Sequence, residues 1–571
     1  MNNSNDNLWK LWVAVATVFC MTVCDAPAAN IVVLYALSNS VDGGTPYGGV
    51  IQASNGVLYG TTVNGGTNGY GAIFSITTNG LFTPLYSFKS IPTDGAQPYA
   101  GLVQGTNGNF YGTASQAGSN NYGSIYKMTS AGGFAEMYGF SLLHLQQSSR
   151  NLTNTDGANP GVGLVQGTNG NFYGAAPAGG SNGYGAVFEI TAAGAFTRLY
   201  SFTNGADGAN PGGLMQSSNG LIYGTATNGG NNGCGAIFKM TAAGVLTPLY
   251  SFMNGVDGAH PGPALTQGTN GVLYGATSAG GTNGSGTIFQ ITTNGVFSPL
   301  YSFATASTSG LGLMTNADGI FPGSLAQGGG GVLYGFCQAG GLNGTGTLFQ
   351  FSPTGGLSVL WTFLVGSLGS GGWINAFGAN PTGITLGRGV LYGTTKDGGS
   401  NSFGTVFQLG IPPQISSQPA SLSLALGSTA TFSIGAAATA CQWQFDGANI
   451  PNATNLSLTN INIQITNAGL YQAIVSNAFG WATSSVACLY ITNVPVSFAT
   501  QGELEYGGGG FGLLVTNLTG QGNVVVEASS DFKTWVPIIT NPPAFGLFPF
   551  TDSSAGGYSS RFYRAHVIPA P

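Results

Sequence analysis

The chain has 571 residues, of which 98 are glycine, and charged residues make up only 5% of it, against about a quarter in a typical soluble domain. This length leaves room for about three or four domains with large cores. With 11 Lys and Arg against 17 Asp and Glu residues, the chain lacks the basic surface that binding to nucleic acid or an anionic membrane requires, so neither is an expected partner.

The N-terminus has the layout of a secretory signal peptide. Lys10 precedes an apolar run over residues 11–23, and small residues follow at Ala28 and Ala29. We therefore expect residues 1–29 to be a signal peptide cleaved near Ala28 or Ala29. The mature protein is then secreted, either extracellular or at the cell surface.

A lipoprotein acylated at Cys24 is the alternative for this segment. Val23, directly before that cysteine, is larger than the residue usually found there, which disfavours lipidation. No later stretch reaches the roughly 18 uninterrupted apolar residues that a membrane-spanning helix needs, so no transmembrane segment is expected in the mature protein.

A Tyr-Gly pair recurs seven times, and another aromatic residue follows each tyrosine at an offset of fifteen. The tyrosines are Tyr59, Tyr111, Tyr173, Tyr223, Tyr274, Tyr334 and Tyr392, and the later aromatics are Phe74, Tyr126, Phe188, Phe238, Phe289, Phe349 and Phe407. Constant internal spacing over seven copies indicates one structural unit that is repeated.

Each copy reads as four short strands joined by Gly-rich turns. In the second copy they are residues 101–104, 109–112, 124–128 and 134–140. The segment 72–76 is apolar on both faces, which a sheet needs only when both of its faces are covered. This pattern predicts the blades of a β-propeller, in which each blade lies between two others.

The ends of the repeat region indicate how the ring closes. The seventh copy ends at residues 404–409 without a fourth strand, while residues 34–37 match residues 85–88 and precede the first blade. Pairing these two segments would bury Leu34 and Leu37 and remove an exposed sheet edge. We predict a seven-bladed β-propeller over residues 30–410, closed by its N-terminal strand.

The recurring Gly-Leu-Val-Gln, Tyr-Gly and Gly-Ala-Ile-Phe sequences resemble the GloVer tandem-repeat family of secreted bacterial proteins. The resemblance covers about two-thirds of the chain. It implies an extracellular bacterial protein, and it implies no particular activity.

An aspartate precedes a glycine in the loop leading into six of the seven blades. These residues are Asp42, Asp94, Asp156, Asp207, Asp257 and Asp318, and Phe377 interrupts the series. They could form a ring of calcium ligands. The favoured interpretation is that each carboxylate caps its own turn, since one copy per blade is what a turn requires.

Other candidates for catalysis or metal binding are scattered. Glu136, Glu189 and Asp397 occupy non-equivalent positions, so no acid and base pair can be assigned. The three histidines, His144, His260 and His566, share no metal-ligand spacing, and His260 stands where sister loops have asparagine. A structural role is favoured for His260, and no cofactor is expected.

One position between the second and third strands of each copy carries an aromatic residue in four copies, at Tyr70, Tyr122, Tyr184 and Phe403. The other three copies have Cys234, Ser285 and Thr345. In a closed ring the four aromatics would be consecutive, on the face that also takes the longer crossings 141–159, 304–321 and 364–380. Such an arc suits sugar stacking, whereas filling gaps between blades is the alternative and the favoured interpretation.

Residues 411–494 have the spacing of an immunoglobulin-like β-sandwich, with Trp443 on a core strand and Tyr471 in a run resembling a tyrosine corner. The usual disulfide positions correspond to Ile434 and Ala473, so that bridge is absent.

The alternation of strand faces also bears on the cysteines of this segment, since it places Cys441 inward and Cys488 outward. Free thiols are therefore expected for Cys234, Cys337, Cys441 and Cys488. Residues 495–571 read as a small C-terminal β-module.

Taken together, these features predict an all-β, non-catalytic binding or adhesion protein with a monomeric propeller. Its ligand, an extracellular polysaccharide or a cell-surface protein, would bind on the loop face at Tyr70, Tyr122, Tyr184 and Phe403. The alternatives are a propeller enzyme acting on polysaccharide, which would need carboxylates converging near the axis, and a self-associating surface-layer component.

Overall fold

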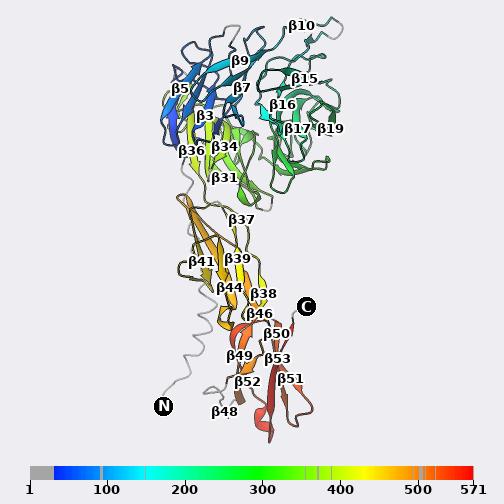
Figure 1. The fold of residues 1–571 in the computed structure, drawn as a ribbon, viewed down its shortest axis with the longest axis vertical. Coiled ribbons are helices and arrows are strands. Elements are labelled where there is room, and N and C mark those ends of the chain that lie inside the picture. Colours follow the sequence, from blue (N-terminus) through cyan, green and yellow to red (C-terminus); the bar gives the residue numbers. More distant parts are fainter. Residues whose placement is uncertain are drawn as a thin grey trace. The chain divides into compact units, whose positions relative to one another are not determined.

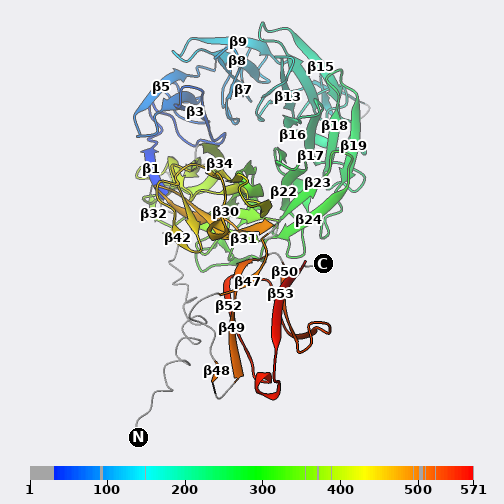
Figure 2. The same ribbon diagram turned by 60° about the horizontal axis from the view of Figure 1, so that its bottom comes forward.

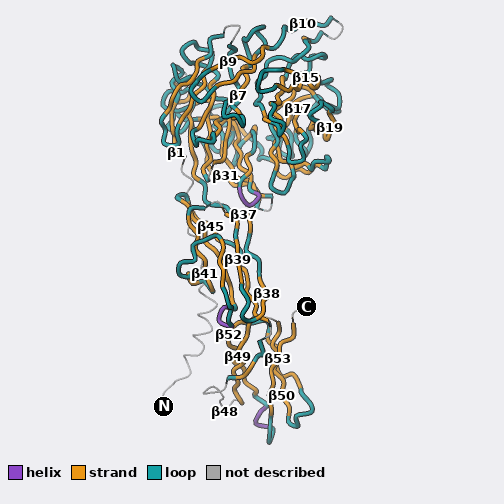
Figure 3. Tube along the Cα trace, in the orientation of Figure 1, coloured by secondary structure: helices purple, strands orange, loops and turns teal. Residues whose placement is uncertain are grey.

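The computed structural model describes residues 31–569, apart from residues 91–93, 148–149, 354, 370–371, 388, 437, 493, 500–505, 508–509 and 521. The predicted signal peptide, residues 1–29, lies outside the described residues. The chain divides into two compact units, Met1–Ile411 and Pro412–Pro571. Figures 1 and 3 show that strands and loops make up nearly all of the described chain.

Helical structure among the described residues is confined to three short 3-10 turns, η1 (Gly329–Gly331), η2 (Ile465–Asn467) and η3 (Ala555–Gly557). None of the helices in the described part of the chain has the length and hydrophobicity that crossing a bilayer requires.

Seven main antiparallel sheets make up the described part of the first unit, numbered in the order of the repeats. Sheet 1 contains β2 (Val50–Gln52), β3 (Leu58–Thr62), β4 (Ala72–Ile76) and β5 (Phe82–Ser87). Sheet 2 contains β6 (Val103–Gln104), β7 (Phe110–Ala114), β8 (Ser124–Met128) and β9 (Phe134–Gly139). Sheet 3 contains β12 (Val165–Gln166), β13 (Phe172–Ala176), β14 (Ala186–Ile190) and β15 (Phe196–Ser201). Sheet 4 contains β16 (Ala209–Gln216), β17 (Ile222–Asn228), β18 (Ala236–Met240) and β19 (Leu246–Ser251).

Sheets 5 and 6 have the same order, but their first strand is split into two pieces that both pair with the second strand. Sheet 5 contains β20 (Ala259–Pro261), β21 (Thr266–Gln267), β22 (Leu273–Ala279), β23 (Thr287–Ile291) and β24 (Phe297–Ser302). Sheet 6 contains β27 (Ile320–Pro322), β28 (Ala326–Gln327), β29 (Leu333–Ala339), β30 (Thr347–Ser352) and β31 (Gly356–Thr362). Sheet 7 contains β34 (Ala379–Gly387), β35 (Val390–Asp397), β36 (Thr405–Gly410) and β1 (Ile31–Ala36). Figure 2 shows the sheets following one another around a common centre.

The first described strand completes the sheet of the last repeat. β1 pairs antiparallel with β36, from Ile31 opposite Leu409 to Ala36 opposite Thr405. The Leu37 N–H also donates to the Gly404 carbonyl oxygen at 3.0 Å, and the Leu37 side chain is buried. The predicted pairing is therefore present. Leu34, which was expected to be buried as well, is only half-buried.

The recurring Tyr-Gly pair and its later aromatic residue are joined by a contact across two strands. Gly224 on β17 is directly opposite Phe238 on β18. A Cβ atom on Gly224 would lie 2.5 Å from the Phe238 ring carbon Cζ, so any larger residue would displace a fully buried ring. Glycine is thus required so that the ring can lie across the neighbouring strand, which explains the constant spacing.

Neighbouring sheets pack face to face through large side chains. Tyr173 and Val187 of sheet 3 share one buried cluster with Ile222 and Phe238 of sheet 4. The third strand of sheet 4, β18, is buried at four of its five positions, as predicted for a sheet covered on both faces.

Polar contacts fix how neighbouring sheets are aligned. The Gln166 side chain accepts from the Thr106 N–H of the preceding repeat at 2.9 Å and donates to Gly170 O of its own turn at 3.0 Å.

Each of the three long crossings carries a small hairpin that the sequence did not predict. The pairs are β10 (His144–Leu145) with β11 (Leu152–Thr153), β25 (Ser307–Thr308) with β26 (Met314–Thr315), and β32 (Ser367–Gly369) with β33 (Gly372–Ile374).

The second unit begins with sheets packed around Trp443, which is fully buried. One sheet has the order β38 (Leu422–Ala425), β46 (Ala487–Thr492), β44 (Gly469–Asn477), β41 (Ala440–Phe445) and β42 (Ala448–Asn449), and β45 (Gly480–Thr483) pairs with β44. The others pair β37 (Ile415–Ser417) with β40 (Gly435–Ala436) and β39 (Ala430–Ser433) with β43 (Ser457–Asn460). The Tyr471 hydroxyl donates to Asn467 O at 2.9 Å, which is the local contact of a tyrosine corner.

The remainder of the second unit forms two further sheets around a core that includes Val515, Leu518 and Val526. One contains β47 (Ser497–Phe498), β48 (Tyr506–Gly507), β49 (Gly510–Thr519) and β52 (Phe545–Asp552), and the other β50 (Gly522–Ser529), β51 (Val536–Asn541) and β53 (Phe562–Pro569). The Thr519 hydroxyl donates to Ile491 O at 2.8 Å, linking this core region to β46.

Candidate ligand-binding face

One residue of each repeat precedes a proline and has a positive φ, which non-glycine residues seldom adopt. These residues are Thr45, Gln97, Asn159, Asn210, His260, Phe321 and Asn380, with φ between 53° and 57°. A hydrogen bond between neighbouring repeats holds this conformation. The His260 N–H, for example, donates to Cys234 O at 2.9 Å, and the Asn210 N–H donates to Tyr184 O at 2.9 Å.

The acceptor carbonyls in these junctions belong to the position where the aromatic arc was predicted. Tyr70, Tyr122, Tyr184 and Phe403 each accept the equivalent hydrogen bond from the next repeat. The four aromatics therefore occupy equivalent places in sheets 7, 1, 2 and 3, beside the positive-φ residues.

The side chains of these four residues differ in exposure. Tyr70 is 43% exposed, whereas Tyr122, Tyr184 and Phe403 are half-buried. Tyr122 packs against the cluster that contains Phe140, and Tyr184 packs against the cluster that contains Phe202. Among the described residues, no ring-to-ring contact joins two of the four. Part of the surface of Tyr122 and of Tyr184 is therefore buried by packing between sheets. Tyr70 has the most exposed side chain of the four.

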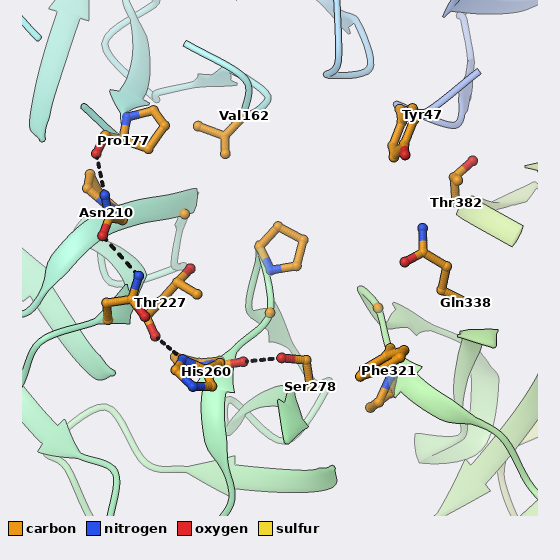
Figure 4. A pocket seen from close by; sticks show the side chains of 18 of the residues that line it. Tyr47, Val162, Pro177, Asn210, Thr227, His260, Ser278, Phe321, Gln338 and Thr382 are labelled. Carbon is orange, nitrogen blue, oxygen red and sulfur yellow. Dashed lines mark hydrogen bonds between the residues drawn. The ribbon is translucent and has the colours of Figure 1, made fainter. Parts of the chain in front are cut away.

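A cavity lies at the inner edges of the sheets, on the side of the positive-φ residues. This arc-side chamber has a volume of about 450 Å³ and is lined by residues of six sheets. Asn210, His260 and Phe321 are among its lining residues, and Tyr47 and Gln338 lie across from His260 in Figure 4. None of its described lining residues is Asp, Glu, Lys or Arg.

Hydrogen bonds fix the polar side of the arc-side chamber (Figure 4). The Asn210 side-chain amide donates to Pro177 O at 2.9 Å, and its Oδ1 accepts from the Asn228 amide at 3.0 Å. The His260 Nδ1 lies 3.1 Å from Thr227 O, and the Ser278 hydroxyl donates to His260 O at 3.1 Å. These hydrogen bonds hold the polar groups of the cavity wall in place.

A second chamber of about 480 Å³ shares Tyr47, Val162, Pro263 and Thr382 with the first. Residues of all seven sheets line it, and its wall is more aliphatic. The rings of Tyr47 and Tyr99 meet edge to face at 5.3 Å in its lining.

The six recurring aspartates are buried and cap their own loops. Asp207 accepts from the Thr203 N–H at 2.7 Å and from the Gly205 N–H at 3.0 Å. It also accepts from the Tyr200 hydroxyl at 3.1 Å, a contact that the sequence did not predict. Burial, together with the charge of Asp207, raises the pKa of Tyr200 to about 12. These contacts support the turn-capping interpretation.

Both members of this pair are replaced at the junction of sheets 6 and 7. Trp361 stands in place of the tyrosine and Phe377 in place of the aspartate, and their rings meet edge to face at 5.3 Å. The Asn375 Oδ1 accepts from the Phe377 N–H at 3.1 Å and the Gly378 N–H at 2.5 Å, as the Asn316 Oδ1 accepts from the Gly319 N–H in the crossing that keeps its aspartate.

The other ionisable groups make local contacts. Glu189 accepts from the Asn171 side chain at 2.5 Å and the Tyr173 hydroxyl at 3.1 Å, and Lys396 lies 3.7 Å from Asp397. Within the described part of the chain, no three His, Cys, Asp or Glu side chains come together as a possible metal site. The described cysteines Cys234, Cys337, Cys441 and Cys488 are free thiols, as expected.

An aromatic-lined pocket of about 380 Å³ also occurs in the second unit, between Phe532, Trp535 and Phe562. The Arg564 guanidinium lies 4.5 Å from the Trp535 ring centroid and donates to Glu527 at 2.6 Å.

Sequence reasoning missed most of the residues that line the arc-side chamber, including Tyr47, Phe321 and Gln338. One sequence feature could have pointed to these residues: in every repeat a proline follows a variable residue, as in Phe321-Pro322, and several of these variable residues line the chamber. His260 was noticed at such a position, and its contact with Thr227 agrees with the structural role expected for it.

Comparisons with known proteins identify the repeats. The model of the Gloeobacter/Verrucomicrobia repeat family matches residues 14–157 and 139–331, which is more than half of the chain. No curated protein matches the chain. Solved structures that match include the tandem Ig repeats of Dlar, 14% identical, covering 20% of this chain and 79% of that one with a TM-score of 0.13, which carries no argument about fold. The chain belongs to the Gloeobacter/Verrucomicrobia (GloVer) repeat family.

Proposed function

We propose that the first unit is a seven-bladed β-propeller and that the second begins with an immunoglobulin-like sandwich. The regular strand order within the seven sheets supports the first assignment, as does the pairing of β1 with β36. The buried Trp443 and the tyrosine corner at Tyr471 support the second.

The protein is proposed to be a secreted bacterial binding or adhesion protein without catalytic activity, monomeric in its propeller. Its ligand is an extracellular polysaccharide or a cell-surface protein, and polysaccharide is the proposal that the chemistry favours. The observations that carry it are the equivalent positions of Tyr70, Tyr122, Tyr184 and Phe403 at the junctions between sheets, and a cavity whose described lining has amides and hydroxyls and no Asp, Glu, Lys or Arg. Aromatic faces and neutral hydrogen-bonding groups suit sugars.

An enzyme acting on polysaccharide is the main alternative. Hydrolysis by the usual route needs two carboxylates on either side of the glycosidic bond. The described residues lining the two chambers include no Asp or Glu, so these chambers offer no such pair. This favours binding over catalysis.

The proposal is tested by sedimentation of the protein with insoluble cellulose, chitin and peptidoglycan. Tyr70→Ala is the cleanest variant, because the exposed ring makes the smallest contribution to packing. The triple variant Tyr70→Ala, Tyr122→Ala, Tyr184→Ala removes most of the arc. We expect the parent to co-sediment with at least one polysaccharide, and both variants to bind less.

The control is the triple variant Leu81→Ala, Val245→Ala, Val296→Ala, which removes exposed apolar side chains from turns between the third and fourth strands. It should bind like the parent. Failure of the parent to bind any of the polysaccharides would contradict a polysaccharide ligand. Equal binding by the parent and by a folded arc variant would show that the arc is a packing feature.

A further inference from the structure

His260 lines the arc-side chamber and is one of the 3 histidines of the chain. Its Nδ1 lies 3.1 Å from Thr227 O, and because a carbonyl oxygen can only accept, the proton must be on Nδ1. The neutral ring then carries a lone pair on Nε2. Among the described residues no hydrogen bond to this Nε2 is found, and the side chain lines the chamber.

The sister repeats show which part of this arrangement is structural. Asn159, Asn210 and Asn380 occupy the same position as His260, and their amides donate to the carbonyls of Ser115, Pro177 and Gln338 at 2.9–3.0 Å. The Nδ1 of His260 reproduces that contact. The Nε2 atom is what histidine adds to that contact.

The surroundings of His260 suit one class of ligand. The Ser278 hydroxyl and the Asn228 and Gln338 amides supply neutral hydrogen-bonding groups, and the rings of Tyr47 and Phe321 supply apolar faces. Phe321 is 45% exposed although its backbone is held at a positive φ, so its ring is presented rather than packed away. A ligand with hydroxyl donors and an apolar ring face, and without charge, fits this combination.

We propose that the arc-side chamber binds one end or branch of a neutral polysaccharide, and that His260 Nε2 accepts a hydrogen bond from a sugar hydroxyl. The aromatic ring of Phe321 packs on the apolar face of the same sugar. This inference rests on the proposed function, since it takes the ligand to be a polysaccharide, and it places recognition in the chamber as well as on the arc. A volume of about 450 Å³ is of the size that holds small ligands.

The matched variant is His260→Asn, which keeps the donor to Thr227 O as the three sister asparagines do and replaces the imidazole ring and its Nε2 with a shorter amide. Asparagine also tolerates the positive φ. The control is Asn380→His, which places a histidine at an equivalent position that does not line the chamber. Calorimetric titration with soluble cello-, chito- and xylo-oligosaccharides measures affinity, and thermal unfolding measures stability.

We expect His260→Asn to weaken binding by roughly three- to tenfold, the usual net effect of one neutral hydrogen bond, at an unchanged melting temperature. Asn380→His should bind like the parent. Imidazole ¹⁵N spectra of the parent protein give a second readout, which does not depend on whether a variant folds. The spectra are simple because the chain has only 3 histidines. One ring should be an Nδ1–H tautomer whose Nε2 signal moves on addition of sugar, and His260→Asn should remove it.

The outcomes separate this inference from the proposed function. If oligosaccharide binding is lost in the Tyr70, Tyr122 and Tyr184 triple variant but unchanged in His260→Asn, binding in the chamber is contradicted. Binding at the aromatic residues Tyr70, Tyr122 and Tyr184 would still be supported. Weaker binding by His260→Asn, together with a sugar-dependent shift of the Nε2 signal in the parent protein, would support binding in the chamber. Absence of binding to every oligosaccharide and polysaccharide tested, peptidoglycan included, would overturn both.

Discussion

The pairing of a tyrosine hydroxyl with a buried aspartate is the most regular polar contact at the residue scale. In sheets 3 and 4 the hydroxyls of Tyr200 and Tyr250 each donate to the aspartate of the following loop at 3.1 Å. The carboxylate thus joins the fourth strand of a sheet to the loop that follows it. Burial and the neighbouring negative charge make ionisation of these phenols unfavourable in the folded state.

Alkaline unfolding should therefore be linked to these tyrosines. Burial first, and then the aspartate charge, raise the pKa values of Tyr200 and Tyr250 to about 12. Because the folded pKa exceeds the usual value of about 10, this stabilisation is complete below pH 10 and is lost as the pH rises from 10 through 12. Tyrosinate absorbance should rise together with loss of circular dichroism in that window. Ionisation of all 24 tyrosines near pH 10 with the fold intact would contradict the pairing.

Thiol accessibility should follow the burial of the four described cysteines. Cys337 and Cys441 are buried, and burial raises the pKa of both thiols, whereas Cys234 and Cys488 are partly exposed. An aromatic disulfide reagent should find two reactive thiols in the folded mature protein and four after denaturation without reductant. A bridge between Cys441 and Cys488, detected by peptide mapping, would show that their assignment to opposite faces of the sandwich is wrong.

At the scale of single elements, the tyrosine corner shows how a short motif stabilises the second unit. The Tyr471 hydroxyl donates to Asn467 O at 2.9 Å and accepts from the Asn460 amide at 3.1 Å, and the ring stacks on Phe432 at 4.5 Å. The ring and the hydroxyl thus contribute separately, the first to the core and the second to the loop before β44.

Tyr471→Phe should keep the ring contact and leave the Asn467 carbonyl and the Asn460 amide without their partner. We expect the free energy of unfolding of the second unit to fall by about 1–3 kcal/mol, measured by urea denaturation. Tyr490→Phe is a control on the partly exposed face of β46 and should change stability by less. Equal stability of Tyr471→Phe and the parent would mean that the corner is not a stabilising contact.

Some strands could be recognised from the sequence and others could not, depending on their length and pattern. The constant spacing of Tyr223 and Phe238 could be recognised in the sequence because Gly224 contacts Phe238 on the adjacent strand, and this local contact recurs in every repeat. The hairpin β10–β11 was not, because two-residue strands such as His144–Leu145 lack any periodic pattern. The split first strands of sheets 5 and 6 were missed for the same reason.

The candidate site was predicted only in part, because it depends on the whole molecule. The arc positions share one place in the repeat and could be aligned from the sequence. The arc-side chamber brings Tyr47 of sheet 1 together with His260 of sheet 5 and Thr382 of sheet 7, and no local pattern relates residues so far apart. Phe321 and His260 occupy a position that is asparagine in three other repeats. Only the packed arrangement of the sheets shows that these two residues line a cavity.

The pairing of β1 with β36 brings the first described strand into the last sheet. The strand pairs with β36 from Ile31 to Ala36, the Thr45 N–H donates to Phe403 O at 2.8 Å, and the Thr382 hydroxyl donates to Pro46 O at 2.6 Å. The first and last sheets are therefore joined along the inner and outer edges of the unit. In the proposed propeller, loss of β1 would expose the edge of β36 and remove the outermost of these contacts.

The most direct measurement is calorimetric unfolding of the mature chain with and without residues 31–37. Deletion removes the buried side chains of Ile31 and Leu37, worth about 1.5–3 kcal/mol each, together with the pairing to β36. We expect the transition of the first unit to be lost, or the protein to aggregate through the freed edge, while the transition of the second unit stays at its original temperature. Leu37→Ala should lower the first transition without abolishing it. An unchanged first transition in the deleted chain would contradict closure of the ring by its N-terminal strand.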